Sequence, residues 1–325
     1  MSGLKRPNQK HLMLFTGRAH PELANEIAAL MDVELVPTRA ITYANSEIYV
    51  RFEESVRGCD AFVIQSHAAP VNEWTMEQLI MVDALKRASA KRITVVAPFY
   101  PYARQDKKHR GREPISARLI ADLFRTAGAN RLMSVDLHAA QIQGFFDGPV
   151  DHLWALPVLS DYLSTKYDTS EMTVVSPDAG RVRLADMWTD RLNSSLAIIH
   201  KRRDPDVANT VAIHEVVGEV EDRVCLLVDD MIDTAGTICQ AAEALKSRGA
   251  RAVIAAATHP VLSGPATDRL KAADFEEVIV TNTLPIPEER RFDSLTVLSI
   301  APLIARAIRE VFEDATSRPV RVGAV

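Results

Sequence analysis

Short runs of apolar, mostly β-branched residues alternate along this chain with segments whose apolar residues recur every three or four positions. Strands that are buried on both faces, as in a parallel sheet, show such continuous apolar runs. The pattern predicts strands at 12–15, 61–65, 92–98, 131–137, 172–177, 196–200, 224–230, 252–259 and 277–283.

Two of the intervening segments have the spacing i, i+3, i+4, i+7 that predicts an amphipathic helix. They are marked by Ile120, Leu123, Phe124 and Ala127, and by Ile238, Ala241, Ala242 and Leu245. Alternation of strands and helices over the whole chain predicts an α/β protein with doubly wound parallel sheets. A barrel is less favoured because the alternation falters at 143–160.

Glycine and proline gather in that interval, at Gly144, Gly148, Pro149 and Pro157. A chain of 325 residues also exceeds the usual size of one domain. We therefore predict two domains, 1–155 and 156–325.

Composition narrows the functional classes. Hydrophobic residues make up 47% and charged residues 25%, as in an average globular protein, and the net charge of -5 argues against general affinity for nucleic acid. No signal peptide and no run of about eighteen apolar residues is present, which predicts a cytoplasmic protein without membrane spans. Cys59, Cys225 and Cys239 form no CxxC pair, so neither disulfides nor a zinc site is predicted.

The stretch LLVDDMIDTAGT, at 226–237, concentrates chemistry at the end of a predicted strand. Asp229 and Asp230 are expected to end the strand, and Asp233 to Thr237 to form the turn into the next helix. Small residues at a helix N-terminus suit a phosphate, whereas carboxylates suit vicinal hydroxyls or a divalent cation. A pentose with two free hydroxyls and a phosphate at its far end satisfies both halves, as ribose 5-phosphate or its 1-diphosphate does. A plain helix cap beside solvated aspartates is the simpler alternative, but it does not account for the whole stretch.

Three other stretches carry charge at predicted strand ends. Residues 100–116 form a basic loop with Arg104, Lys107, Lys108, Arg110 and Arg112, which is either a solvated surface or a cover for a triphosphate. The stretch 136–146 places His138 at a strand end, as a structural histidine or a metal ligand. The stretch 198–205 contains Lys201, Arg202 and Arg203, which either face solvent or stabilise a transferring phosphoryl group.

The stretches RQDKK, DLHAAQIQGFF, VVSPDAGRVR, HKRR and VDDMIDTAGT occur in the order found in the ribose-phosphate diphosphokinase family. The chain resembles the class I bacterial members of that family over nearly its whole length. The resemblance implies two domains of type I phosphoribosyltransferase-like fold. It also implies transfer of the diphosphoryl group of ATP to the 1-hydroxyl of ribose 5-phosphate, with release of AMP.

The resemblance also implies roles for individual residues. Lys201 and Arg203 match the catalytic pair, and His138 and Asp178 match the Mg²⁺ positions. Asp229 and Arg203 are implied to contact the ribose phosphate, together with the 5-phosphate loop Asp233, Thr234, Ala235, Gly236 and Thr237. The ATP contacts are implied to be Tyr43, Asn45, Glu47, Arg104 and Gln105. A homo-hexamer with phosphate and ADP as effectors is implied as well, with no nucleic-acid partner.

One stretch departs from the family pattern. The family reads Phe-x-Asn-Gly-Glu where this chain reads YANSE, with Tyr43 and Ser46 at the changed positions. Tyrosine keeps a flat ring for stacking. Where the family glycine has a positive φ, Ser46 is expected to cost on the order of 1 kcal/mol or to shift the loop, which bears on adenine affinity.

Two other functions remain to be weighed. A non-catalytic regulatory homologue would be signalled by loss of Lys201, Arg203 or the basic loop, and none is lost. A phosphoribosyltransferase acting on a base would need a hood for that base, whereas the N-terminal half here is a complete second domain. A P-loop kinase is excluded in its usual form because the chain has no GxxxxGK[ST] motif.

Overall fold

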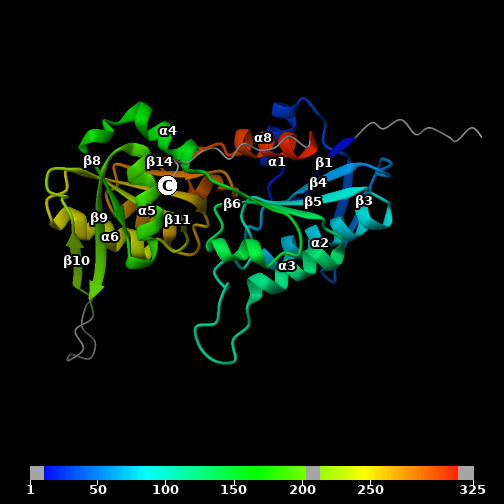
Figure 1. Cartoon of the computed structure of the whole chain (residues 1–325), viewed down its shortest axis with the longest axis horizontal. Coiled ribbons are helices and arrows are strands. Elements are labelled where there is room, and N and C mark those ends of the chain that lie inside the picture. The colour runs from blue at the N-terminus through cyan, green and yellow to red at the C-terminus, as the bar shows by residue number, and fades with distance from the viewer. Residues whose placement is uncertain (1–10, 203–212, 314–325) are drawn as a thin grey trace, which may run out of the picture. The chain divides into compact units, whose positions relative to one another are not determined.

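The computed structural model describes residues 11–202 and 213–313. Within them the chain divides into two compact units. The first runs to Leu153 and also contains the segment that begins at Ala301, and the second runs from Trp154 to Ile300 (Figure 1). Each unit has its own parallel sheet and its own hydrophobic core.

The first unit contains a five-stranded parallel sheet with the order β1-β4-β5-β6-β7 and a separate antiparallel hairpin, β2-β3. Its strands are β1 (Leu12–Thr16), β2 (Thr38–Thr42), β3 (Ile48–Phe52), β4 (Asp60–Ile64), β5 (Arg92–Ala97), β6 (Arg131–Val135) and β7 (Val150–Leu153). Its helices are α1 (Pro21–Met31), α2 (Val71–Arg87), α3 (Ser116–Ala127), the short 3₁₀ helix η1 (Ala140–Gly144) and α8 (Ala301–Phe312).

The sheet of the first unit has its topological switch point at β1 and β4. A bridge pairs Leu14 with Leu35, and Leu14 also pairs with Phe62 of β4, so the chain leaves β1 on one side and returns on the other. Helices accordingly cover both faces. Helix α1 packs with α8, and α2 packs with α3, as the layers in Figure 1 show.

The second unit contains a seven-stranded sheet with the order β10-β9-β8-β11-β12-β13-β14, in which only β10 is antiparallel to its neighbour. Its strands are β8 (Met172–Ser176), β9 (Ser195–Arg202), β10 (Ile213–Val217), β11 (Val224–Ile232), β12 (Ala252–Pro260), β13 (Glu277–Thr281) and β14 (Leu295–Leu298). Its helices are α4 (Leu156–Lys166), α5 (Val182–Leu192), α6 (Gly236–Ser247) and α7 (Ala266–Ala272), with short 3₁₀ helices η2 (Thr169–Glu171), η3 (Ala179–Arg181) and η4 (Glu288–Arg290).

The switch point of the second sheet lies between β8 and β11. The chain passes from β8 to β9 on one side, and from β11 to β12, β13 and β14 on the other. In open α/β sheets, ligands bind outside the carboxyl ends of the strands at this point. The fold therefore favours a ligand site at the segments that follow β8 and β11.

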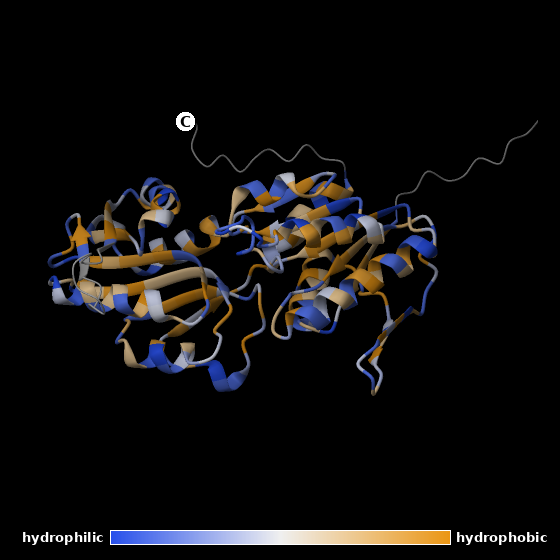
Figure 2. Ribbon diagram, turned by 90° about the horizontal axis from the view of Figure 1, so that it is seen from below, coloured by the Kyte–Doolittle hydropathy of each residue, from blue (hydrophilic) through white to orange (hydrophobic). Residues whose placement is uncertain are grey.

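Continuous burial explains why the predicted strands form. All residues of β4, β8 and β13 are buried, and each buried Val, Ile or Leu side chain contributes about 1.5–3 kcal/mol. Figure 2 shows the same pattern, with hydrophobic strands inside and hydrophilic helix surfaces outside. The two doubly wound parallel-sheet units confirm the predicted fold class, and all nine predicted strands are present.

Three details differ from the sequence-based expectations. Helix α8 belongs to the first unit, where it packs on α1, whereas the expected division placed it in a second domain of 156–325. Leu123, expected on the buried stripe of α3, is 39% exposed, and Ala117 and Ala121 occupy the buried face with Ile120 and Phe124. The third difference concerns the acidic stretch of β11, which continues beyond its aspartates.

Candidate active site

Asp229 and Asp230 lie in the second half of β11. The strand was expected to end at these residues, but it continues to Ile232 because β12 still pairs with it there. Its other neighbour, β8, pairs only as far as Leu227. The two carboxylates therefore lie on β11 just beyond the point where β8 stops pairing with it, at the switch point of the second sheet.

Arg181 forms ion pairs with both of these carboxylates. Its Nε lies 2.9 Å from Asp229 Oδ1, and its Nη2 lies 2.6 Å from Asp230 Oδ1. Burial, reinforced by the carboxylate of Asp230, raises the pKa of Asp229 well above its ordinary value, and Arg181 opposes that rise. Arg181 was not singled out in the sequence. Its position in η3, directly after β8, is what brings it to β11.

The segment Asp233–Thr237 follows β11 and has the backbone of an anion site. Ala235 has a φ of 59° and a ψ of 4°, in the left-handed region, and Gly236 begins α6. A left-handed residue followed by a right-handed helical one turns successive N–H groups toward one concave side, which is a typical anion-binding nest. No side chain caps the N-terminus of α6, and Thr234 and Thr237 are exposed. The free N–H groups of the first turn and the helix dipole favour a phosphate here.

Asp178 lies in the segment that follows β8. Its side chain is exposed, and its Oδ1 accepts a hydrogen bond from the N–H of Gly180 at 2.7 Å. A carboxylate with oxygen exposed to solvent suits a hard divalent cation. Among the residues described, no cluster of three or more His, Cys, Asp or Glu side chains has the geometry of a metal site.

Lys201 lies near the carboxyl end of β9, where its backbone pairs with His214 of β10. β9 is the neighbour of β8 in the sheet. Arg203, the second predicted catalytic residue, lies outside the described residues.

Tyr43, Asn45 and Glu47 occupy the tip of the β2-β3 hairpin in the first unit. Tyr43 pairs with Glu47 across the hairpin, and its carbonyl accepts the N–H of Ser46 at 2.8 Å. Ser46 has a φ of 72°, so it adopts the left-handed conformation that favours glycine. The rings of Tyr43 and Tyr49 lie 6.3 Å apart, and both are exposed. The tip therefore presents an exposed aromatic surface, and Ser46 within it has a strained backbone conformation.

Arg104 and Gln105 begin the basic loop between β5 and α3, which Figure 1 shows as a long excursion beyond the helices. Gln105 anchors the loop base, because its side-chain oxygen accepts the hydroxyl of Ser116 at 2.7 Å. Farther along, Glu113 Oε2 accepts the N–H groups of His109 at 2.7 Å and Arg110 at 3.0 Å. These backbone hydrogen bonds, that of Arg110 first, lower the pKa of Glu113.

His138 lies after β6, two residues before η1. A hydrogen bond from Gln141 in η1 to the buried carboxylate of Asp106 ties this segment to the basic loop. The structure thus brings together two motifs of the first unit that are more than thirty residues apart in the sequence.

The switch point of the first sheet is filled by the protein itself. The buried carboxylate of Glu77 accepts the backbone N–H of Arg18 at 2.7 Å and the side-chain amide of Gln65 at 2.9 Å. A Cβ atom at Gly17 would lie 2.3 Å from the side chain of Gln65. Gln65 and Glu77 thus occupy the space beside Gly17, at the carboxyl end of β1.

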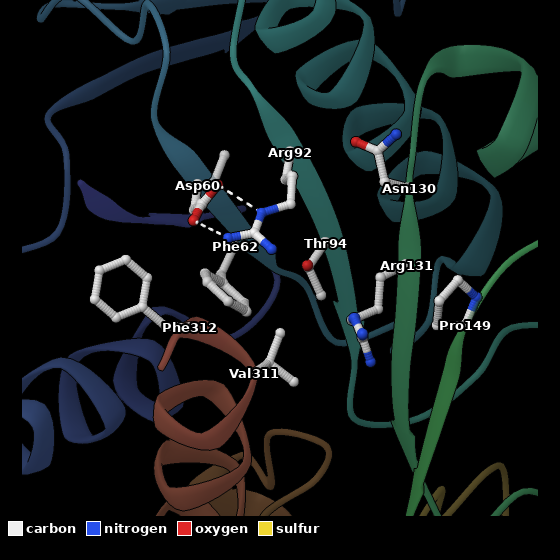
Figure 3. A pocket seen from close by; sticks show the side chains of 10 residues that line it. Asp60, Phe62, Arg92, Thr94, Asn130, Arg131, Pro149, Val311 and Phe312 are labelled. Atoms are coloured by element: carbon white, nitrogen blue, oxygen red, sulfur yellow. Dashed lines mark hydrogen bonds and ion pairs between the residues drawn. The ribbon is translucent and has the colours of Figure 1, made fainter. Parts of the chain in front are cut away.

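A pocket of about 130 Å³ lies at the opposite, amino-terminal edge of the first sheet (Figure 3). Arg92 makes hydrogen bonds of 2.9 and 2.6 Å to Asp60 there, and Arg131 pairs with Asp151 at 2.8 Å. Since both cations have carboxylate partners, this pocket is poorly suited to a phosphate, and none of the predicted site residues lines it.

No helix among the described residues has the length and apolarity needed to cross a bilayer. Of the three cysteines, all unpaired, Cys59 and Cys225 are buried and Cys239 is partly so.

Comparisons with known proteins agree with this architecture. Residues 12–128 match the N-terminal domain of ribose phosphate pyrophosphokinase, and residues 208–318 match the phosphoribosyl synthetase-associated domain. The chain is 67% identical to the ribose-phosphate pyrophosphokinase of Streptomyces coelicolor over 97% of each chain, and 63% identical to that of Mycobacterium leprae over 94% of each. The crystal structure of phosphoribosylpyrophosphate synthetase from Mycobacterium smegmatis superposes with a TM-score of 0.90 at 62% identity, covering 94% of this chain and 100% of that one.

Proposed function

This chain belongs to the ribose-phosphate pyrophosphokinase family, and we propose that it transfers the diphosphoryl group of ATP to the 1-hydroxyl of ribose 5-phosphate. The products are 5-phosphoribosyl 1-diphosphate and AMP. The diphosphate product serves nucleotide, histidine and tryptophan biosynthesis.

The observation that carries this proposal is the pairing of two features in the second unit. The nest at Ala235 and Gly236 suits the 5-phosphate, and the carboxylates of Asp229 and Asp230 on the preceding strand suit the ribose hydroxyls. A plain helix cap does not account for this arrangement, because α6 has no side-chain cap.

The first unit carries the residues proposed for ATP. Tyr43 offers an exposed ring for stacking on adenine, with Asn45 and Glu47 beside it as hydrogen-bonding groups. Arg104 and Gln105 contact the phosphates from the basic loop, whose further cations balance the triphosphate charge.

The reaction joins O1 of the sugar to the β-phosphorus of ATP and breaks the bond from that phosphorus to the oxygen that stays with AMP. Such transfers depend on positioning and charge neutralisation more than on covalent catalysis. Lys201 and Arg203 are proposed to neutralise the charge on the transferring group. The M. leprae and S. coelicolor relatives are both named for the catalytic activity, which does not favour a regulatory homologue.

Mg²⁺ is the proposed cofactor, and His138 of the first unit and Asp178 of the second are the proposed positions for its binding. It would neutralise phosphate charge and hold the ATP phosphates in a reactive arrangement. Asp178 fits this role because its carboxylate is exposed and only one of its oxygens holds the Gly180 N–H. A homo-hexamer, with phosphate and ADP as effectors, completes the proposal.

The direct experiment incubates the protein with ATP, Mg²⁺ and ribose 5-phosphate and separates the nucleotides. AMP that forms only when the sugar is present supports the proposal, and ADP as the sole nucleotide product contradicts it. Lys201→Ala is expected to lower kcat at least about 100-fold while ribose 5-phosphate still binds. Unchanged turnover in this variant would refute the role of Lys201.

A further inference from the structure

Three consecutive carbonyl groups, from the end of β11 into the segment Asp233–Thr237 (the phosphate loop), accept hydrogen bonds from residues 262–269 of the second unit. The N–H of Leu262 donates to the carbonyl of Ile232 at 2.9 Å, and that of Ser263 donates to the carbonyl of Asp233 at 2.8 Å. The third carbonyl, of Thr234, accepts Nη1 of Arg269 on α7 at 2.9 Å. Arg269 supplies the one side-chain donor of the three.

This arrangement is characteristic of a curled backbone. In an extended strand, successive carbonyls point to opposite sides, so three consecutive carbonyls held by the same segment indicate a curled backbone. The N–H group of each of these peptides points to the opposite side from its carbonyl, which is the orientation that an anion-binding nest needs. The connection from β12 to α7 therefore supports the loop from behind.

The hydrogen bond from Arg269 fixes the orientation of one particular peptide. A trans peptide is planar, and its C=O and N–H point in opposite directions. With the carbonyl of Thr234 held by Arg269, the N–H of Ala235 faces away from Arg269. A flipped peptide would instead turn a carbonyl oxygen toward a bound phosphate and repel it.

Ala235 is the residue at which this peptide most needs support. Its φ of 59° is unfavourable for a residue with a Cβ, so the loop relies on its surroundings to keep this conformation. The guanidinium also brings positive charge to the loop, because a Cβ added at Gly236 would lie 3.4 Å from Arg269 Nη1. Burial raises the pKa of the Cys239 thiol in α6 to about 11, and the charge of Arg269 opposes that rise.

We propose that Arg269 is a positioning residue for the sugar phosphate: it holds the Thr234 carbonyl outward so that the Ala235 N–H faces the 5-phosphate, and it adds positive charge behind the loop. The inference rests on the proposed function in taking ribose 5-phosphate as the ligand. Arg269 itself is exposed, and α7 is anchored by the buried Ala266 and Leu270 instead. Replacing its side chain is therefore compatible with folding.

The test compares Arg269→Ala, Arg269→Gln and Arg269→Lys with wild type in direct binding of ribose 5-phosphate by calorimetry and in steady-state kinetics. Lys271→Ala is the matched control, because it removes an exposed positive charge from the same helix. Loss of a charge-assisted hydrogen bond is expected to weaken ribose 5-phosphate binding about ten- to hundredfold in Arg269→Ala. Binding to the lysine variant, which keeps the charge and a donor, is expected to be closer to wild type.

The Michaelis constant for ATP is expected to stay within about twofold of wild type in all four variants, since Arg269 supports the sugar-phosphate loop only. Ribose 5-phosphate binding within twofold of wild type in Arg269→Ala overturns the inference. The inference is also overturned if Arg269→Ala weakens the interaction with ATP as much as that with ribose 5-phosphate, because an equal effect indicates general damage to the fold. If the wild type binds ribose 5-phosphate but releases no AMP, the proposed reaction fails while the comparison at Arg269 still decides the positioning role.

Discussion

The guanidinium of Arg181 forms an ion pair with the carboxylate of Asp229, with Nε and Oδ1 2.9 Å apart. The same guanidinium also reaches Asp230, so one cation pairs with two adjacent carboxylates on β11 and offsets part of their charge. Without it, two negative charges would lie together at a partly buried strand end. Arg181 thereby allows the acidic pair proposed for the ribose hydroxyls to exist in the ligand-free protein.

Replacing Arg181 with Met is expected to lower the free energy of unfolding by about 2–3 kcal/mol at neutral pH, since it leaves both carboxylates uncompensated. The folded-state pKa of Asp229 is already above its unfolded value, so ionising it costs stability as the pH rises through the folded pKa. Ionising Asp229 costs more without Arg181. The decrease in the free energy of unfolding should therefore be larger at pH 8 than at pH 5. Urea denaturation at both pH values measures it, with Arg183→Met, an exposed neighbour, as control. Equal losses at the two pH values would contradict this account.

Ser46 is strained at the tip of the β2-β3 hairpin, with a φ of 72°. Glycine relieves this strain, whereas a β-branched residue worsens it. We expect the Michaelis constant for ATP to rise severalfold in Ser46→Val and to stay equal or fall in Ser46→Gly, with that for ribose 5-phosphate unchanged in both. A glycine variant that binds ATP more weakly than the valine variant would show that backbone strain at this position does not govern adenine binding.

Glu113 organises the basic loop through two backbone N–H groups. Glu113→Ala should open the loop more often and speed tryptic cleavage at its lysines and arginines by roughly three- to tenfold. Mass spectrometry of the early fragments measures the rate, and ATP should protect both proteins. Because the pKa of Glu113 is lowered, the same opening should occur in the wild type only as the pH falls below the ordinary carboxyl range. Cleavage at an unchanged rate in the variant would show that Glu113 does not hold the basic loop closed.

Glu277, buried at the start of β13, accepts hydrogen bonds from Tyr162 at 2.6 Å and Tyr167 at 2.7 Å and pairs with Lys166 at 3.0 Å. Burial alone would raise its pKa, but the hydrogen bonds, that of Thr296 first, outweigh burial and lower it below the ordinary 4.5.

Its contribution to stability is therefore full above pH 4.5 and is lost as the pH falls through the folded value. Glu277→Gln should lower the free energy of unfolding by about 2–4 kcal/mol at pH 7 and remove part of the acid dependence. Thermal denaturation between pH 3 and 7 tests this, with the exposed Glu276→Gln as control. If the stability of Glu277→Gln depends on pH as that of the wild type does, carboxylates other than Glu277 cause the acid dependence.

The parts of the fold that were predictable are those in which burial is continuous. Strands such as β4, β8 and β13 are buried at every residue, and a largely apolar run in the sequence indicates this burial. The β2-β3 hairpin escaped prediction because it has no fully buried residue and so no continuous apolar run, and charged residues such as Arg39 and Arg51 interrupt it. The edge strands β7 and β14 are short and only partly buried, which leaves an equally weak signal.

The sequence indicated candidate site residues where they are consecutive. Asp229 to Thr237 form one stretch, whereas Arg181 and Arg269 reach that stretch only through the fold. Arg181 meets β11 because the strand order places β8 beside it, and no spacing in the sequence encodes that order. Arg269 reaches Thr234 from 35 residues away. Residue roles that depend on strand order therefore required the structure.

The most direct test of the central claim follows the β-phosphorus of ATP. ATP labelled at that position is incubated with the protein, Mg²⁺ and ribose 5-phosphate, and the sugar and nucleotide products are separated. The label is expected to leave the nucleotide and to appear in the sugar product, in equal amount to the AMP formed. Label that remains in ADP, with a sugar product that has gained a single phosphate, would contradict it.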